Sequence, residues 1–253
     1  MGHIISISNQ KGGVGKTTTA VNLSACIAAG DKTCLLIDSD PQGNATTGFG
    51  IRPDSLDHGL YDFLIDGIPF EKAAVQTSLP KLQIIGATRN LIGADVEIAS
   101  MPGREFLLKK ALASLKGHFD YIFIDCPPSL SFLTVNALTA AESILIPVQC
   151  EYYALEGLSQ LLKTAQAIKK SLNPTLRIAD IVLTMYDKRN NLSRQVASEA
   201  RSLFKKRVFN TVIPRNVRLS EAPSHGKPVI LYDIRSKGAQ SYLSLAKELI
   251  EKE

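Results

Sequence analysis

The sequence predicts an α/β protein: a single domain with a mostly parallel, twisted β-sheet and helices on both faces. Strand-like runs of apolar residues alternate with helix-like segments along the 253 residues. This alternation is typical of a parallel sheet whose strands are joined by helices. No internal repeat, low-complexity tract or linker-like stretch divides the sequence, so we expect one domain over residues 1–253.

The expected elements follow from hydrophobic runs taken in chain order. Strands are predicted at 4–8, 33–37, 82–86, 121–125, 143–148, 178–183 and 208–213 because each is a short apolar run. Helices are predicted at 20–29, 104–116, 155–172, 192–206 and 242–252. Residues 51–80, which contain several prolines and glycines, are expected to be a surface insertion with one short helical stretch at 60–64.

A glycine-rich segment joins the first predicted strand to the first predicted helix. Backbone N–H groups of such a loop, and the positive end of the helix after it, attract polyphosphate. Glycines let the backbone approach the ligand because they carry no side chain. We expect Lys16 to contact the β- and γ-phosphates and the Thr17 hydroxyl to ligate Mg²⁺. The predicted nucleotide-binding residues here are Lys11, Gly12, Gly13, Val14, Gly15, Lys16, Thr17 and Thr18.

Three aspartates follow predicted strands whose carboxyl ends lie at one edge of the sheet. Ligands of open parallel sheets bind beyond that edge. Asp125 follows Tyr-Ile-Phe-Ile and has the form of an acid that holds Mg²⁺ directly or through a water. Asp38 and Asp40 follow the second strand. For Asp38, a place in the metal shell, a structural role and a catalytic role all remain open.

Charge and composition restrict the class of partner and compartment. Residues 187–238 contain twelve Lys or Arg and four Asp or Glu, a net charge of +8, whereas the whole chain carries +5. Such asymmetry indicates a polyanionic partner. No apolar run approaches the ~20 residues of a membrane span, and no signal peptide precedes the first strand. The four cysteines lack metal-site spacing and are expected to be reduced, buried thiols of a cytoplasmic protein.

The motif Lys-Gly-Gly-Val-Gly-Lys-Thr-Thr at 11–18 resembles the deviant Walker A box of the ParA/MinD superfamily of P-loop NTPases. Four further segments resemble the ParA/Soj chromosome-partitioning ATPases, and the last two are the more specific. They are Asp-Pro-Gln-Gly-Asn-Ala-Thr (40–46), Asp-Cys-Pro-Pro-Ser (125–129), Pro-Val-Gln-Cys-Glu-Tyr-Tyr-Ala-Leu-Glu-Gly (147–157) and Pro-Arg-Asn-Val-Arg-Leu-Ser-Glu-Ala-Pro-Ser-His-Gly-Lys-Pro (214–228).

The resemblance implies roles for individual residues. Lys11 would reach the nucleotide bound by a second copy of the chain, and Asp40 would position the attacking water, so both join Lys16 as expected catalytic residues. Met185, Pro214 and Asn216 would surround the adenine. A guanine-specific Asn-Lys-x-Asp motif is replaced by Thr-Met-Tyr-Asp at 184–187, which disfavours GTP.

The resemblance also implies a cycle that uses ATP and Mg²⁺. ATP would drive formation of a homodimer that binds double-stranded DNA without sequence preference on the nucleoid. A ParB-type centromere-binding protein would then stimulate hydrolysis and release the dimer. Arg189 and Arg218 match family positions for DNA contact, and Lys188, Arg194, Lys205, Lys206 and Arg207 are supporting candidates. For any one of these, a solvated helix face is the alternative. The first strand begins near residue 4 with no helix-turn-helix ahead of it, so sequence-specific repression is not expected.

Three other functions fit parts of the pattern. A MinD-like division ATPase would bind membrane through a basic C-terminal helix, whereas this chain has three acids among its last six residues. An iron–sulfur reductase of the nitrogenase type requires two accessible cysteines per chain. A non-catalytic nucleotide switch would not need Asp40.

Overall fold

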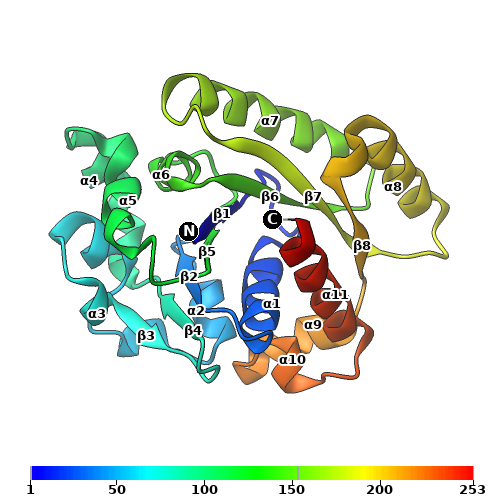
Figure 1. The fold of residues 1–253 in the computed structure, drawn as a ribbon, viewed down its shortest axis with the longest axis horizontal. Helices are drawn as coiled ribbons and strands as arrows, with labels where there is room; N and C mark the ends of the chain where they lie inside the picture. Colours follow the sequence, from blue (N-terminus) through cyan, green and yellow to red (C-terminus); the bar gives the residue numbers. More distant parts are fainter. Residues whose placement is uncertain (1, 153, 253) are drawn as a thin grey trace.

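A computed structural model describes residues 2–152 and 154–252 as an α/β fold built on one eight-stranded sheet (Figure 1). The strand order is β3-β4-β2-β5-β1-β6-β7-β8. Only the β3–β4 pair at one edge is antiparallel; the other neighbouring strands are parallel. The prediction of a mostly parallel sheet is therefore confirmed. The strands are β1 (His3–Ile7), β2 (Cys34–Asp38), β3 (Ala74–Gln76), β4 (Leu82–Ile85), β5 (Tyr121–Asp125), β6 (Ser143–Gln149), β7 (Arg177–Tyr186) and β8 (Val208–Pro214).

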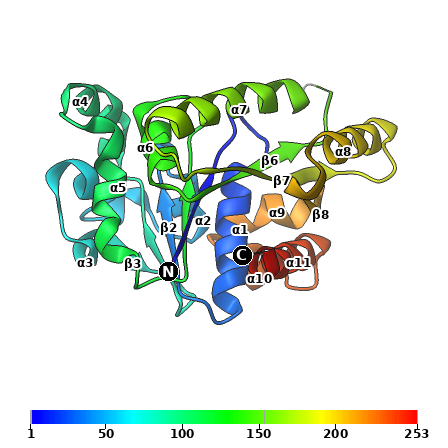
Figure 2. The same cartoon turned by 45° about the horizontal axis from the view of Figure 1, so that its top comes forward.

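Helices cover both faces of the sheet, with α1 and α11 on one side and α6, α7 and α8 on the other (Figures 1 and 2). Two further helices, α4 and α5, lie beside α6 over the β2–β4 end. The α-helices are α1 (Lys16–Ala29), α2 (Asn44–Gly48), α3 (Phe70–Ala73), α4 (Ala94–Ser100), α5 (Leu107–Ala111), α6 (Phe132–Ala140), α7 (Ala154–Ser171), α8 (Asn191–Phe204), α9 (Val217–Glu221), α10 (Val229–Tyr232) and α11 (Lys237–Lys252).

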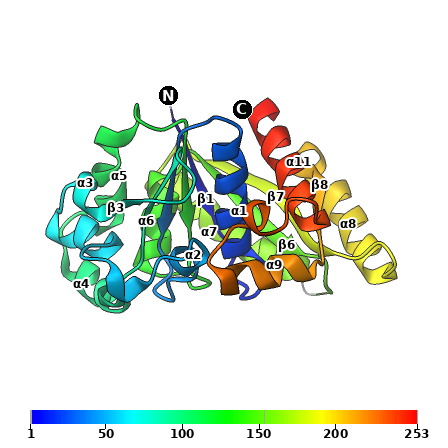
Figure 3. The same ribbon diagram turned by 90° about the horizontal axis from the view of Figure 1, so that it is seen from below.

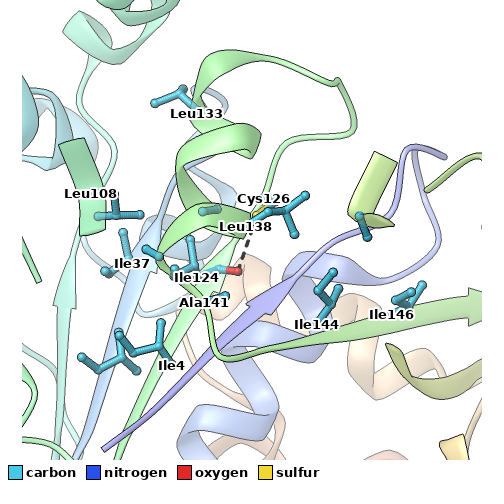
Figure 4. Packing of buried hydrophobic residues seen from close by; sticks show 14 of the residues in the cluster. Ile4, Ile37, Leu108, Ile124, Cys126, Leu133, Leu138, Ala141, Ile144 and Ile146 are labelled. Atoms are coloured by element: carbon cyan, nitrogen blue, oxygen red, sulfur yellow. Dashed lines mark hydrogen bonds between the residues drawn. The ribbon is translucent and has the colours of Figure 1, made fainter. Parts of the chain in front are cut away.

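Alternating side chains of the central strands divide the core into two layers. Ile5 and Phe123 face the layer that includes α1 and α11, while Ile4 and Ile124 face the opposite layer, because successive strand residues point to opposite faces. Figure 4 shows the second layer, where Ile4, Ile37 and Ile124 pack with Leu133 and Leu138 of α6. Burial on both sides explains why these strands are continuous apolar runs rather than alternating ones.

Several predicted boundaries were wrong. Residues 51–80 are not simply a surface insertion, because they contribute the edge strand β3 and the buried side chains of Leu60, Phe63 and Leu64. The helix predicted at 104–116 is broken into a short α5 flanked by 3-10 turns at 104–106 and 113–115. No helix was predicted at α6, which is buried on nearly all sides and so lacks an amphipathic stripe.

The parallel register brings the ends of β1, β2 and β5 together. Asp125 pairs in register with Ile7 on one side and with Asp38 on the other. The segments after these strands therefore meet at one edge of the sheet, which we call the carboxyl edge (Figure 3). The opposite edge, where both ends of the chain lie, is the amino edge. Among the described helices, none combines the length and the apolarity of a membrane span.

Candidate nucleotide-binding site

The loop between β1 and α1 is held in a fixed shape by bonds to the neighbouring strands. Asn9 Nδ2 donates to the Pro147 carbonyl at 2.7 Å, and Thr184 Oγ1 donates to the Val14 carbonyl at 2.8 Å. Gly13 (φ 73°) and Gly15 (φ 91°) have left-handed backbones that favour glycine. A Cβ placed on Gly13 would meet no atom within 4 Å, so the space before the loop is open to a ligand.

Lys16 begins α1 and places a largely buried cation above this loop. Its side chain donates from Nζ to the Lys11 carbonyl at 3.1 Å, and the residue is only 6% exposed. Burial lowers the pKa of Lys16, while the nearby carboxylate of Asp125 partly restores it. A phosphate group in the open space would give this ammonium the counter-charge that water no longer provides.

Asp125 is a fully buried carboxylate whose two oxygens accept no hydrogen bond from the described residues. Burial, and then the charge of Asp38, raise its pKa well above the usual value. The nearby Thr17 hydroxyl lowers that pKa in part. Such a group is costly to bury unless a cation satisfies it.

These donors fit a Mg²⁺ ion held together with a nucleotide. An unbonded carboxylate and a threonine hydroxyl are oxygen ligands, which Mg²⁺ prefers. Within residues 2–152 and 154–252, no group of three or more His, Cys, Asp or Glu side chains forms a metal site. A cation beside Asp125 would therefore take most of its ligands from phosphate oxygens and water, as Mg²⁺ commonly does in nucleotide sites.

Asp38 makes the hydrogen bonds of a structural residue. Its Oδ2 accepts from the backbone N–H of Thr46 at 2.8 Å and from the Thr46 hydroxyl at 2.7 Å. The same hydroxyl oxygen accepts from the Ala87 N–H at 3.0 Å. Burial raises the pKa of Asp38 to about 6. These bonds attach α2 to the end of β2, and a place for Asp38 in the metal shell stays a prediction.

Asp40 lies in the turn between β2 and α2, with 8% of its surface exposed. Its Oδ1 accepts from the Gln42 N–H at 3.0 Å, and its carbonyl accepts from Gly43 N–H at 2.9 Å. This turn holds the Asp40 carboxylate at the carboxyl edge, where its negative charge favours the protonated form of Lys16. The role of Asp40 in orienting water stays a prediction.

The Lys11 ammonium pairs with a carboxylate that lies just after β6. Its Nζ lies 3.5 Å from Glu151 Oε2 of the same chain, and its side chain is 37% exposed. Glu151, just after β6, is also 3.9 Å from Arg215 Nη2. We did not single out Glu151 or Arg215 from the sequence, although both lie inside motifs quoted for the family resemblance. Their pairing depends on strand adjacency that no local pattern reveals.

A cavity of about 340 Å³ adjoins the phosphate loop and has room for a base. All three residues predicted to surround adenine line it: Met185, Pro214 and Asn216. Met185 has a left-handed backbone (φ 51°) that is unusual for a bulky residue. Asn216 Oδ1 caps α9 by accepting from the Arg218 N–H at 3.0 Å. The wall formed by Leu219, Ser220 and Pro223 was not predicted.

The structure divides the predicted DNA-binding residues between two places. Lys188, Arg189, Arg194 and Arg218 lie in segments at the carboxyl edge, at the start of α8 and in α9 (Figure 3). Lys205, Lys206 and Arg207 lie beyond the other end of α8. The 14 residues of α8 span roughly 20 Å, so the seven do not form one compact patch. Arg189 pairs with Asp187, and Arg218 pairs with Glu221 and Asp233.

The four cysteines are free and buried, as predicted. Cys126, beside the phosphate loop, is 0% exposed, and burial raises its pKa to about 11. An iron–sulfur reductase would need accessible cysteine ligands from each chain, and these four thiols do not meet that requirement.

Comparison with known proteins identifies the family. A family model described as an AAA domain matches residues 2–178. The chain is 57% identical over 249 residues to the sporulation initiation inhibitor protein Soj of Bacillus subtilis, covering 98% of each chain. It is 54% identical to the chromosome partitioning protein ParA of Myxococcus xanthus, covering 100% of this chain and 89% of that protein.

Solved structures of related proteins have the same fold, and some of them contain bound nucleotide and magnesium. A cobyrinic acid a,c-diamide synthase from Mycobacterium smegmatis with bound ADP and magnesium is 35% identical, with a TM-score of 0.86 over 99% of this chain and 94% of that one. The cell division ATPase MinD of Pyrococcus furiosus is 28% identical, with a TM-score of 0.81 over 100% of both chains. The chain belongs to the ParA/Soj family of chromosome-partitioning ATPases.

Proposed function

We propose that this ATPase is a nucleotide-controlled DNA tether. With ATP and Mg²⁺ it forms a homodimer that binds double-stranded DNA without sequence preference, and hydrolysis releases it. The observation that carries the proposal is the position of Lys11, whose ammonium pairs with Glu151, just after the neighbouring strand β6. Once it leaves Glu151, this lysine can neutralise phosphates held by a second copy, which makes dimer formation depend on the triphosphate.

Residues of the chain divide the work of hydrolysis. The loop amides and Lys16 hold the phosphates, and Thr17 and Asp125 hold the cation, which when bound neutralises charge that develops on the phosphate oxygens. Asp40 orients the attacking water, and Asp38 holds the Asp40 turn to α2. Residues 1–253 act as one ATPase domain in this proposal, since a single sheet carries every part of the site.

The base cavity supports ATP as the nucleotide. Its walls are Met185, Pro214 and neighbouring apolar side chains, and its polar groups include the Asn216 side chain. Apolar contact with the ring and a few polar groups at its rim suit an adenine. No acidic side chain is among the residues that line the cavity, whereas guanine recognition in P-loop GTPases uses the aspartate of the Asn-Lys-x-Asp motif sought in the sequence.

The basic residues Lys188, Arg189, Arg194 and Arg218 at the carboxyl edge support contact with DNA phosphates. Arg189 is 86% exposed and its partner Asp187 is only two residues away, so the pair is weak and can open to a phosphate. Cations without a base-reading helix give salt-sensitive, sequence-independent binding. Nucleoid association would follow from this binding, and a ParB-type partner would end it by stimulating hydrolysis.

The last helix gives no support to the alternative of membrane binding. The apolar residues Tyr242, Leu245 and Leu249 of α11 are buried in the core. They are therefore unavailable to lipid unless the helix leaves the domain. Co-sedimentation with anionic vesicles should accordingly remain at background with ADP or ATP.

The test is a DNA-binding titration with ADP, ATP and a non-hydrolysable ATP analogue at several salt concentrations. We expect binding only with the triphosphates, with affinity that falls steeply as salt rises. Lys11→Ala should lose both dimer and DNA binding, while Arg189→Glu should keep the dimer and lose DNA. Lys247→Glu, a charge reversal at an exposed site on α11, is the matched control and should bind as the wild type. DNA binding that is equal with ADP and ATP would overturn the proposal.

A further inference from the structure

Glu151 is placed to control Lys11 before any second copy is present. The two residues follow β1 and β6, which are neighbouring parallel strands, so the segments after them meet at the carboxyl edge (Figure 1). The carboxylate that Lys11 meets within its own chain is Glu151, at 3.5 Å. An ammonium held there cannot at the same time contact phosphates in another chain.

The Glu151 carboxylate has further partners that fix its position. Its Oε1 accepts a hydrogen bond from Gln149 Nε2 and lies 3.9 Å from Arg215 Nη2. Arg215 in turn lines the base cavity, and its backbone N–H donates to the Tyr186 carbonyl at 3.2 Å. Glu151 therefore stands between the phosphate loop and the wall of the base cavity, with Lys11 near one of its carboxylate oxygens and Arg215 near the other.

We propose that Glu151 is a positioning residue that retains Lys11 on its own chain and so sets the threshold for ATP-dependent pairing of two copies. This inference rests on the proposed role of Lys11 in the dimer. Lys11 leaves Glu151 when it reaches the partner's nucleotide, and Arg215 remains to neutralise the acid. Each ATP-bound dimer breaks two such pairs, and the free energy of breaking them opposes association of the two copies.

The expected effect is modest because the pair is partly solvated. The Lys11 and Glu151 side chains are 37% and 47% exposed, and an exposed pair changes an equilibrium constant by no more than about fivefold. Two pairs per dimer give a shift of roughly 3- to 20-fold in the dimer dissociation constant. The shift should shrink at high salt, since salt screens exposed charges.

Glu151→Gln tests the inference because it removes the charge and keeps the shape of the side chain. Dimer formation is measured by sedimentation velocity over a range of protein concentrations, with a non-hydrolysable ATP analogue and Mg²⁺. We expect this variant to form dimers at 3- to 20-fold lower concentration than the wild type in low salt, and at nearly the same concentration in high salt. Glu251→Gln removes a more exposed Lys–Glu pair on α11 and should leave the dimer constant unchanged.

The double variant Lys11→Ala/Glu151→Gln separates this role from others. It should behave as Lys11→Ala does, because Glu151 acts only through Lys11. Unchanged or weaker dimer formation by Glu151→Gln, or a gain that persists without Lys11, would overturn the inference and leave the proposed function intact. If Lys11→Ala forms dimers as well as the wild type, the proposed function and the inference both fail, and this outcome is distinguishable from the first two.

Discussion

Replacing Asp125 by Asn should stabilise the nucleotide-free chain, and the gain should grow with pH. Asp125 is fully buried, and neither carboxylate oxygen accepts a hydrogen bond from the described residues. Burial, and then the charge of Asp38, raise its pKa in the folded chain well above that of an ordinary aspartate. An acid with a raised pKa binds a proton in the folded chain at a pH where the unfolded chain has already released it.

The sign and size of the effect follow from that shift. The stability that comes from the retained proton is fully present below the unfolded pKa and is lost as pH rises through the folded pKa. Within that window one proton changes the free energy of unfolding by about 1.4 kcal/mol per pH unit. Asn carries no such proton, so the gap between variant and wild type should widen by up to about 1.4 kcal/mol per unit. Lys16 loses the favourable charge of Asp125, which makes this figure an upper bound.

The assay is urea unfolding from pH 5 to pH 8, without nucleotide and with a chelator. Asp120→Asn is a control of opposite sign, because hydrogen bonds from Thr33 lower the pKa of Asp120. The Asp120 carboxylate stabilises the folded chain at pH values above its pKa in the unfolded chain, and this stabilisation is lost as pH falls through its lower pKa in the folded chain. A pH-independent gap for Asp125→Asn, or a variant less stable than the wild type at pH 8, would refute the reasoning. Mg²⁺ with ATP should stabilise the wild type much more than the variant.

Three other substitutions test separate parts of the structure. Thr46→Val removes a hydroxyl that donates to buried Asp38 and should lower the free energy of unfolding by about 2 kcal/mol. Thr139→Val is its control, since that buried hydroxyl has no partner among the described residues, and urea unfolding should show little change. Met185→Ala in the base cavity should raise KM for ATP roughly threefold to tenfold with little change in kcat, in a steady-state phosphate-release assay. Glu248→Ala frees the Asn210 and Thr211 N–H groups on the outer edge of β8 and should promote aggregation, detected by light scattering. The Thr46–Asp38 contact would be contradicted if Thr139→Val lost as much stability as Thr46→Val. An unchanged KM in Met185→Ala would contradict the contact of Met185 with the base. A Glu248→Ala variant that stays monodisperse would contradict the role of Glu248 in covering the edge of β8.

Most of the sheet could be predicted because its strands are buried on both faces. The run Tyr121–Asp125 is buried at every residue. A short, continuous apolar run of this kind is typical of a strand buried on both faces of a sheet. The amphipathic helices α7 and α8 were also predicted within one or two residues of their ends. The helix α6 was missed for the same reason that the strands were found, since burial on nearly all sides leaves no helical period to detect.

The site could be predicted where its residues are local in sequence. The phosphate loop depends on glycines and a lysine within a few residues, and its backbone needs left-handed conformations at Gly13 and Gly15. The structure brings Asp38 and Asp125 into register as the strand-end argument expected. By contrast, the Lys11–Glu151 pair joins residues 140 positions apart. The separation of Lys205, Lys206 and Arg207 from the basic residues at the carboxyl edge depends on the length and direction of α8. Both follow from the tertiary arrangement rather than from any local pattern.

A crystal structure with a non-hydrolysable ATP analogue and Mg²⁺ tests the central claim most directly. We expect two copies face to face, with Lys11 Nζ of each copy released from Glu151 and within hydrogen-bond distance of a phosphate oxygen in the other. A monomer that holds the triphosphate while Lys11 remains on Glu151 of its own chain would contradict the account.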